Sequence, residues 1–215
     1  TKISEEEFHQ VSSYLKNSRR PIILLGGGFQ RFGDSIKIFH EKISKLNIPV
    51  MTTWNALDRI DSDHPLYFGR PDNWGQRYSN ILLQQSDLLI AVGAKLSFQQ
   101  TGFNTEEFLP KGKIIHVDIE KDELEKSNPK QRIGINDSSE SFLNCLREIL
   151  SDNPKGNQTD EWIELLNDIR SSLPNLEQCQ IVSNHNFISP NEVIEMVSQL
   201  ASDDTRIVAA SSGGT

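Results

Sequence analysis

The sequence predicts an α/β fold in which helices cover both faces of a doubly wound, all-parallel sheet, followed by a C-terminal helical extension. Three short apolar runs, 22–25, 88–92 and 113–119, are typical of strands buried on both faces. Helical stripes of apolar residues separate these runs, so strands and helices alternate along the chain. The glycines Gly26, Gly27 and Gly28 follow the first run, as they do at the entrance to a nucleotide-binding βα unit.

The composition is that of a globular protein with a polar surface. The 215 residues carry a formal net charge of −8, which argues against nucleic acid or an anionic membrane as a partner. No apolar run approaches membrane-spanning length. The two cysteines, Cys145 and Cys179, are far apart and lack metal-ligand spacing, so we expect no metal site and no disulfide framework. A cytoplasmic setting is the default expectation.

Capping signals and apolar stripes define the N-terminal part. Ser4 and Glu7 have the spacing of a capping box, so a helix should begin there. Apolar residues at helical spacing then predict a second helix after the glycines. The predicted elements are a helix to about Asn17, the strand 22–25, a helix over 36–46, a strand over 50–53 and an irregular stretch over 54–70.

The middle of the chain continues the alternation. Asp137 and Glu140 have the spacing of another cap and box, ahead of a helical stripe. The predicted elements are a helix over 74–85, the strand 88–92, the strand 113–119, a short strand over 132–135 and a helix over 142–150.

The C-terminal third reads differently. Residues 151–158 have the composition of a linker, a helix is expected around 162–169, and 178–187 is polar and irregular. Ser189, Pro190 and Glu192 predict the start of another helix, and a strand is expected over 206–209. We therefore expect three parts: a nucleotide-binding-type domain (1–150), a linker with one helix (151–188) and the start of a further domain (189–215). With no initiator Met and a final strand and turn without a helix, the chain is interpreted as a segment of a longer polypeptide.

The candidate ligand residues follow the predicted strands. In an open parallel sheet, ligands bind beyond the carboxyl ends of the strands, so these residues should meet in one crevice. They are Gly26, Gly27, Gly28, Thr53, Gly93, Lys95, Asp118 and Ile119. Asp118 could accept hydrogen bonds from ribose hydroxyls, or it could cap a helix that begins near Glu120. The alternative for the glycines is a plain tight turn.

No catalytic group can be read from the sequence. His116 lies within a predicted strand and His64 precedes a proline in a turn, so structural roles are expected for both. No Ser–His–acid arrangement stands out. The sequence therefore predicts a ligand crevice without catalytic residues.

Four blocks of the sequence resemble the central domain of thiamine-diphosphate-dependent enzymes of the acetolactate synthase and 2-oxo acid decarboxylase type. The blocks, in the family's order, are RPIILLGGG (20–28), IPVMTTWNA (48–56) with DHPLYFG (63–69), SDLLIAVGA (86–94) and KIIHVDIE (113–120). Residues 189–215 are similar to the opening of the family's diphosphate-binding domain. The resemblance implies a Rossmann-like, NAD/FAD-binding (DHS-like) fold for residues 1–150.

The resemblance also implies cofactors and partners. The full-length enzyme would bind thiamine diphosphate and Mg²⁺, act on a 2-oxo acid and form a homodimer or homotetramer. Its catalytic glutamate and its metal motif would lie in other domains, so this chain alone would be inactive; only Gly213 would lie beside thiamine diphosphate. In the synthases the central domain binds FAD in a structural role, and in relatives it holds ADP or nothing.

The resemblance assigns contacts with the adenine dinucleotide to particular positions. They are Gly26, Gly27, Thr53, Gly93, Asp118, Ile119 and Asp137. The synthases usually carry an arginine after the third-strand glycine, whereas this chain has Lys95 there, and lysine lacks the planar fork that clamps a diphosphate. Two alternatives stay open: a scaffold module that holds no ligand, and a free-standing NAD enzyme, which would need a GxGxxG motif that this chain lacks.

Overall fold

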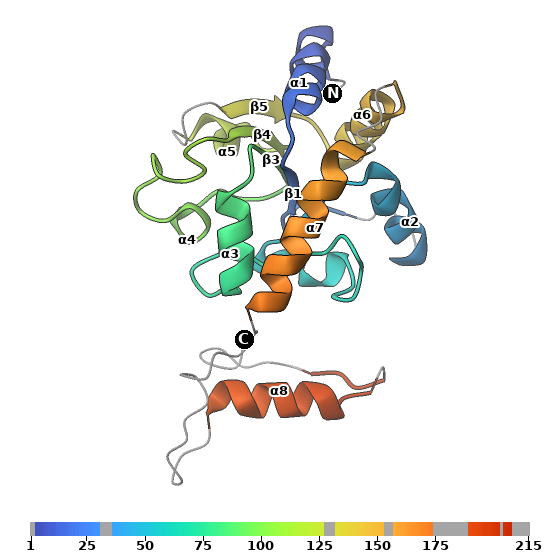
Figure 1. Ribbon diagram of the computed structural model, residues 1–215. Helices are drawn as coiled ribbons and strands as arrows, with labels where there is room; N and C mark the ends of the chain where they lie inside the picture. Colours follow the sequence, from blue (N-terminus) through green and yellow to red (C-terminus); the bar gives the residue numbers. More distant parts are fainter. Residues whose placement is uncertain are drawn as a thin grey trace. The chain divides into compact units, whose positions relative to one another are not determined.

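The computed structural model describes residues 3–30, 36–126, 132–152, 157–173, 189–202 and 204–207. The chain divides into two compact units, Thr1–Ser171 and Ser172–Thr215. The elements (Figure 1) are α1 (Glu5–Asn17), β1 (Pro21–Leu25), α2 (Ile36–Leu46), β2 (Val50–Thr52), the 3-10 helix η1 (Trp54–Arg59), α3 (Arg77–Gln84), β3 (Leu88–Val92), α4 (Phe98–Thr101), β4 (Lys113–Asp118), α5 (Lys121–Glu125), β5 (Arg132–Asn136), α6 (Ser139–Asp152), α7 (Asn157–Ser172) and α8 (Pro190–Leu200).

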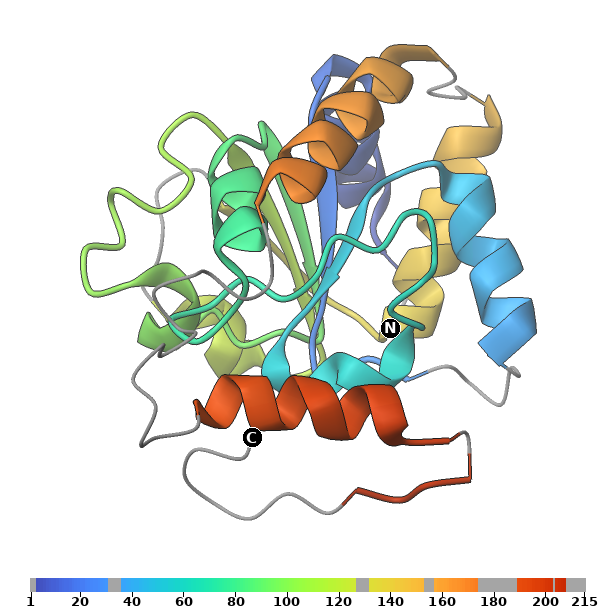
Figure 2. The ribbon, with the colours of Figure 1, turned by 60° about the horizontal axis from the view of Figure 1, so that its bottom comes forward.

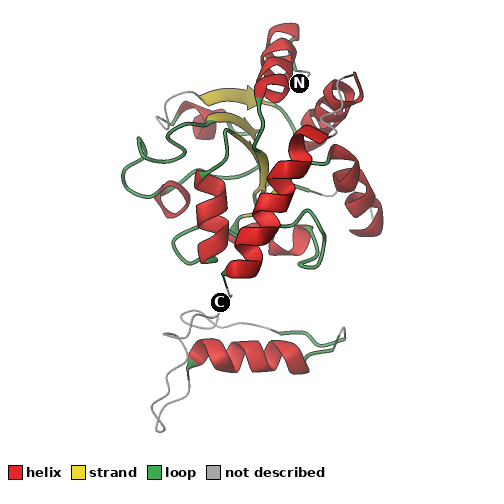
Figure 3. Ribbon diagram, viewed as in Figure 1, coloured by secondary structure: helices red, strands yellow, loops and turns green. Residues whose placement is uncertain are grey.

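The first unit is built on a five-stranded sheet in the order β2-β1-β3-β4-β5. Every neighbouring pair is parallel, and Ile23 of β1 pairs with both Val50 of β2 and Ile90 of β3. The strands lie at the centre, with helices around them (Figure 3). The predicted α/β class with a parallel, doubly wound sheet is confirmed.

Helices pack on both sides of this sheet. Helices α2 and α6 lie side by side on one side, and α3 lies on the other (Figures 1 and 2). Alternate residues of β3 explain the two layers, because Leu88, Ile90 and Val92 join one buried cluster with the apolar stripes of α1, α2 and α6. Leu89 and Ala91, whose side chains point to the opposite face, are also fully buried. Such burial on both faces is why the strands read as continuous apolar runs.

A capping box and an aspartate clamp hold the N-terminal helix. The Ser4 side chain accepts a hydrogen bond from the backbone N–H of Glu7, and the Glu7 carboxylate accepts one from the Ser4 N–H, as predicted. The carboxylate of Asp87, just before β3, accepts three hydrogen bonds, from Ser18 Oγ (2.5 Å) and from the backbone N–H groups of Arg19 (2.8 Å) and Arg20 (3.0 Å). Asp87 thus joins the α1–β1 connection to the start of β3.

Helix α7 packs against the sheet unit. The indole N–H of Trp162 donates to the carbonyl of Pro21 at 3.2 Å, and the Arg170 guanidinium donates to the carbonyl of Tyr67 at 2.9 Å. Leu166 is fully buried. The helix expected around 162–169 is confirmed and is longer; the domain limits at 150 and 188 stay predictions.

Two predicted elements differ from the structure. The helix expected from Trp74 begins only at Arg77, because Asp72 accepts a hydrogen bond from the Trp74 N–H (2.6 Å) and Gly75 closes a turn onto the Asp72 carbonyl. The prediction of a strand from 206 to 209 is wrong for Arg206 and Ile207, which are in loop, and 208–209 lie outside the described residues. So does the stretch 178–187.

The cap of α6 is also corrected. The residue at the cap is Ser138, whose Oγ accepts from the Ser141 N–H at 3.2 Å, whereas Asp137 was expected there. Asp137 instead accepts a hydrogen bond from the N–H of Ser138 through Oδ1 (2.7 Å). The offset of one residue leaves the second oxygen of Asp137 available for another role.

In the second unit, the described residues form the helix α8 and short flanking segments. It begins as predicted, with Ser189 at the cap and Pro190 in the first turn, although the Ser189 side chain makes no capping hydrogen bond. Its apolar residues are exposed; they are Val193, Ile194, Met196, Val197 and Leu200. Among the helices of the described ranges, none has the length and apolar character needed to cross a membrane.

Candidate ligand cavity at the carboxyl edge of the sheet

The strand order reverses between β1 and β3, which places a crevice at the carboxyl edge of the sheet. The chain passes from β1 to the edge strand β2 and returns to β3 on the other side of β1, so the loops after β1 and β3 diverge. Two glycines allow these loops to touch: a Cβ on Gly26 would lie 2.0 Å from the Gly93 carbonyl oxygen, and Gly93 has a φ of +58°. The contact is a backbone requirement of the fold, and it forms the floor of the site.

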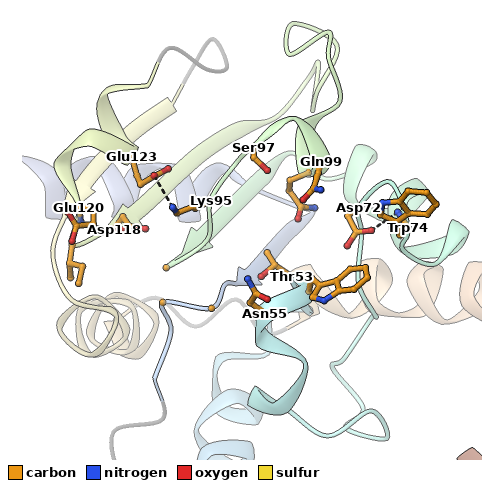
Figure 4. A pocket seen from close by; sticks show the side chains of 16 residues that line it. Thr53, Asn55, Asp72, Trp74, Lys95, Ser97, Gln99, Asp118, Glu120 and Glu123 are labelled. Atoms are coloured by element: carbon orange, nitrogen blue, oxygen red, sulfur yellow. Dashed lines mark hydrogen bonds and ion pairs between the residues drawn. The ribbon is translucent and has the colours of Figure 1, made fainter. Parts of the chain in front are cut away.

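A cavity of about 690 Å³ lies above this floor (Figure 4). This volume is within the range of small-molecule and cofactor sites. The lining residues come from the loops after β1, β2 and β3, from the end of β4 and from α4 and α5. They are Gly27, Gly28, Thr53, Trp54, Asn55, Asp72, Trp74, Gly93, Lys95, Ser97, Gln99, Gln100, Asp118, Ile119, Glu120 and Glu123.

Seven of the ten candidate residues line this cavity. They are Gly27, Gly28, Thr53, Gly93, Lys95, Asp118 and Ile119. Gly26 lies beneath the floor, against the backbone of residues 93 and 94, and Asp137 lines a smaller neighbouring hollow of about 170 Å³. Gly213 lies outside the described residues. The strand ends therefore meet in one crevice, as expected, while the ligand roles of these residues stay predictions.

Asp118 does not cap α5, and its predicted role toward a ribose stays a prediction. Its Oδ1 accepts a hydrogen bond from the Glu120 N–H at 2.9 Å, but the residue that caps α5 is Glu120. Asp118 is thus in a local turn ahead of the helix and not at its cap. Because a carboxylate has two oxygens, this turn still allows Asp118 to accept a hydrogen bond from a ligand hydroxyl.

Asp137 has a buried oxygen without a partner. The residue is 3 % exposed, and Oδ2 makes no hydrogen bond with any described residue. The hollow that it lines shares Gly28, Gly93, Asp118 and Ile119 with the large cavity, so the two are adjacent. An unpaired buried oxygen costs free energy, which makes Asp137 a candidate acceptor for a donor group on a ligand.

The part of the cavity near α5 is acidic. Asp118, Glu120 and Glu123 lie there with one cation, Lys95, whose ammonium is 3.4 Å from Glu123 Oε1 (Figure 4). Glu123 also accepts from Lys126 at 2.5 Å, and this bond is the main cause that lowers the pKa of the Glu123 carboxyl. Glu123 is therefore ionised at neutral pH, and its charge is directed at Lys95.

The part of the cavity that faces away from α5 is aromatic. Trp54 and Trp74 line it. Trp74, which is labelled in Figure 4, is 74 % exposed. The Arg70 guanidinium carbon lies 4.8 Å from the centre of a Trp54 ring, and its Nε lies 3.4 Å from the buried carboxylate of Asp72. These contacts hold the Trp54 ring beside the cavity, whose wall also carries Gln99 and Gln100.

His116 and His64 have the structural roles that the sequence predicts. His116 is buried; its Nε2 lies 2.8 Å from the carbonyl of Ala94 and its Nδ1 lies 3.3 Å from Arg132 Nη1. Because arginine can only donate, Nδ1 must accept and Nε2 must carry the proton. Burial lowers the pKa of His116, so the ring is neutral. His64 is buried as well, with its Nε2 at 3.2 Å from Ser44 Oγ.

Cys145 is the buried free thiol of the described chain. Burial raises the pKa of Cys145 to about 11, which makes it a poor nucleophile at neutral pH. It lies in the apolar cluster on α6, away from the cavity lining.

Several cavity residues were not predicted. Trp54 and Asn55 come directly after Thr53, just beyond the end of β2. The rule that ligands bind beyond the carboxyl ends of parallel strands, which placed Thr53, could therefore have placed these two residues as well. Glu123 could not be found in this way, because its position depends on how α5 folds back over the sheet edge. Asp72, Trp74 and Gln99 come from a loop and a four-residue helix without a periodic pattern.

The lining fits an adenine dinucleotide or a nucleoside diphosphate in its parts. Asp118 and the unpaired oxygen of Asp137 suit hydroxyl and amino donors, and the tryptophans suit a flat ring system. For the phosphates, the backbone N–H of Gly27 donates to no described residue, and Lys95 supplies the charge. The residues present therefore fit the group, and among the described lining residues Lys95 is the one cation to balance its diphosphate.

Comparison with known proteins shows the family to which the chain belongs. Residues 8–146 match the family described as "Thiamine pyrophosphate enzyme, central domain". The chain is 32 % identical over 171 residues to the acetolactate synthase isozyme 1 large subunit of Escherichia coli K12, covering 80 % of this chain and 29 % of that protein. It is 30 % identical over 204 residues to the acetolactate synthase large subunit of Cyanidium caldarium (92 % and 33 %).

A third relative is similar to this chain in identity and in the share of each protein that is covered. The acetolactate synthase of Mycobacterium avium is 28 % identical over 210 residues, which cover 97 % of this chain and 33 % of the relative. The chain thus spans about a third of the length of these curated relatives. From its sheet, its cavity and these matches, the chain belongs to the family of thiamine pyrophosphate enzymes and comprises their central domain.

Proposed function

We propose that this chain is the central part of an acetolactate synthase-like, thiamine-diphosphate-dependent enzyme that decarboxylates or ligates a 2-oxo acid. The match of residues 8–146 to the central domain of such enzymes carries the proposal, and the acetolactate synthases among the relatives support it. The full-length enzyme would bind thiamine diphosphate and Mg²⁺ in other domains, assemble as a homodimer or homotetramer and be cytoplasmic.

The cavity at the carboxyl edge would hold the adenine nucleotide, FAD or ADP. Gly27 and Gly28 would lie against the diphosphate, Lys95 would neutralise part of its charge, and Asp118 would accept from a ribose hydroxyl. Asp137 would use its unpaired Oδ2 to accept from a donor on the nucleoside. A flavin can supply redox chemistry, but the role proposed for this domain is binding and orientation.

Calorimetric titration of the purified chain with FAD and with ADP tests this site. We expect saturable binding of at least one of them, weakened about tenfold by Asp137→Asn, which replaces the acceptor oxygen with an amide. Asp58→Asn is the matched control, because Asp58 is exposed and lies outside the cavity lining. Equal affinities for the two variants would refute the role of Asp137.

A scaffold module without a ligand is the second candidate. One observation favours it: four carboxylates line the cavity (those of Asp72, Asp118, Glu120 and Glu123) against one lysine, which is unfavourable for an anion. Absence of heat with both nucleotides would favour this reading.

The chain alone should also be inactive. The proposed enzyme needs domains beyond this one, so we expect no decarboxylation of pyruvate when thiamine diphosphate and Mg²⁺ are added to the purified chain. Turnover by the chain, in a preparation free of host enzyme, would contradict this.

A further inference from the structure

We propose that Glu123 sets the affinity of the carboxyl-edge cavity for phosphate-bearing ligands by holding Lys95, and so determines how strongly the site distinguishes a nucleoside diphosphate from the bare nucleoside. This inference rests on the proposed nucleotide site and adds to it a residue that opposes binding. Three features of the structure carry it: the ion pair, its support by the surrounding chain and the second partner of Glu123.

The ion pair couples Lys95, the one cation among the described lining residues, to a carboxylate on the same wall. Lys95 is 75 % exposed along its side chain, so its ammonium can reach a ligand, whereas Glu123 is 12 % exposed. Both residues line the cavity, and Lys95 points toward Glu123 (Figure 4). A phosphate that enters must compete with Glu123 for Lys95 and must also approach a negative charge.

The position of Glu123 is built into the fold. The guanidinium of Arg132 on β5 donates to the carbonyls of Leu124 and Lys126 (2.7 Å for the latter), which fixes the short helix α5. Arg132 also contacts His116, and His116 donates to the carbonyl of Ala94, next to Lys95. One chain of hydrogen bonds therefore ties the Lys95 loop to the helix that carries Glu123.

Glu123 can release Lys95 without becoming unpaired. Lys126, three residues on, donates to the same oxygen of Glu123 at 2.5 Å and does not line the cavity. When an anion takes Lys95, Glu123 keeps its bond to Lys126, so the exchange leaves no bare charge. A diphosphate can therefore displace Glu123 from Lys95, and this competition lowers the affinity of the site for the diphosphate.

Glu120 provides a matched control. It lines the same part of the cavity and carries the same charge, but no ion pair joins it to Lys95 in the described chain. Glu120→Gln and Glu123→Gln therefore remove equal charge from one wall. A difference between them isolates the contact with Lys95 from the general acidity of the site.

The test is calorimetric titration with ADP and with adenosine of the wild type, Glu123→Gln, Glu120→Gln, Lys95→Gln and the Lys95→Gln/Glu123→Gln double variant. We expect Glu123→Gln to lower the Kd for ADP by about fivefold to tenfold, the size of one charge interaction at a wet surface. The Kd for adenosine should stay within about twofold, and so should the Kd for ADP in Glu120→Gln. The gain should fall to within about twofold when Lys95 is also replaced, because only the general repulsion by the Glu123 charge then remains.

The outcomes separate the two proposals. If ADP binds and Glu123→Gln leaves its Kd unchanged, or if Glu120→Gln gives the same gain, the role of Glu123 is wrong while the nucleotide site stands. A gain of more than about twofold that persists without Lys95 also overturns it. If neither ADP nor adenosine binds any variant that retains the wild-type circular dichroism spectrum, the nucleotide site itself fails, and this inference with it.

Discussion

Replacing Asp87 with alanine should destabilise the sheet unit by about 3 kcal/mol. The Asp87 carboxylate accepts three hydrogen bonds, from the Ser18 hydroxyl and from the N–H groups of Arg19 and Arg20. A hydrogen bond to a charged group contributes about 1.5–3 kcal/mol. The full sum is not expected, because Arg19 and Arg20 are exposed and water can replace the lost acceptor there. Ser18 is 5 % exposed, so its hydrogen bond to Asp87 would be lost in a place that water reaches poorly.

Urea denaturation followed by circular dichroism measures this loss. For a unit of this size, about 3 kcal/mol corresponds to a fall in Tm of roughly 6–12 °C. Asp87→Asn, which keeps one acceptor oxygen, should fall between the wild type and the alanine variant. The exposed Asp58, whose partner is its neighbour Arg59, is the control, and Asp58→Ala should cost less than about 0.5 kcal/mol. A loss at Asp87 no larger than at Asp58 would refute the clamp.

Three further predictions concern backbone contacts, protonation and packing. Gly26→Ala should cost at least about 3 kcal/mol in urea denaturation or prevent folding, because its Cβ would overlap the backbone of Gly93; Gly102→Ala, with open space but a φ of +75°, should cost only about 1–2 kcal/mol. Burial lowers the pKa of His116 in the folded state, so the unfolded chain binds the proton first as the pH falls. The free energy of unfolding should therefore fall as the pH drops below about 6.5 toward the folded pKa. His116→Gln should make the free energy of unfolding depend less on pH in this range. Leu166→Ala should cost about 3 kcal/mol in the same unfolding transition as the sheet, and a separate transition for α7 would contradict its packing there.

The sheet was predictable because its strands are short, apolar and buried on both faces. Residues 88–92 illustrate this, since five consecutive apolar residues in a charged, polar chain have few places to lie other than a covered parallel strand. The meeting of strand ends at one edge then follows from parallel topology, which is why Thr53, Gly93 and Asp118 could be placed in one crevice.

The remaining features depend on contacts that sequence spacing does not encode. Trp74 looked helical by periodicity, but the Asp72 side chain and Gly75 form a turn there and delay α3. The cap of α6 moved by one residue because Ser138 and Asp137 are both good capping residues, and the fold decided between them. The position of Glu123 depends on Arg132 of the next strand, which donates to the carbonyl of Lys126 at the end of the helix that carries Glu123.

The sheet and the cavity wall are made by different parts of the chain. Of the described residues that line the cavity, only Asp118 belongs to a strand, and it is the last residue of β4. The glycines of the floor are required by the backbone contacts of the fold, but the other lining side chains can change without altering the paired, buried strands, so ligand preference can drift during evolution at little cost to folding. One scaffold can in this way change its ligand preference while its architecture persists.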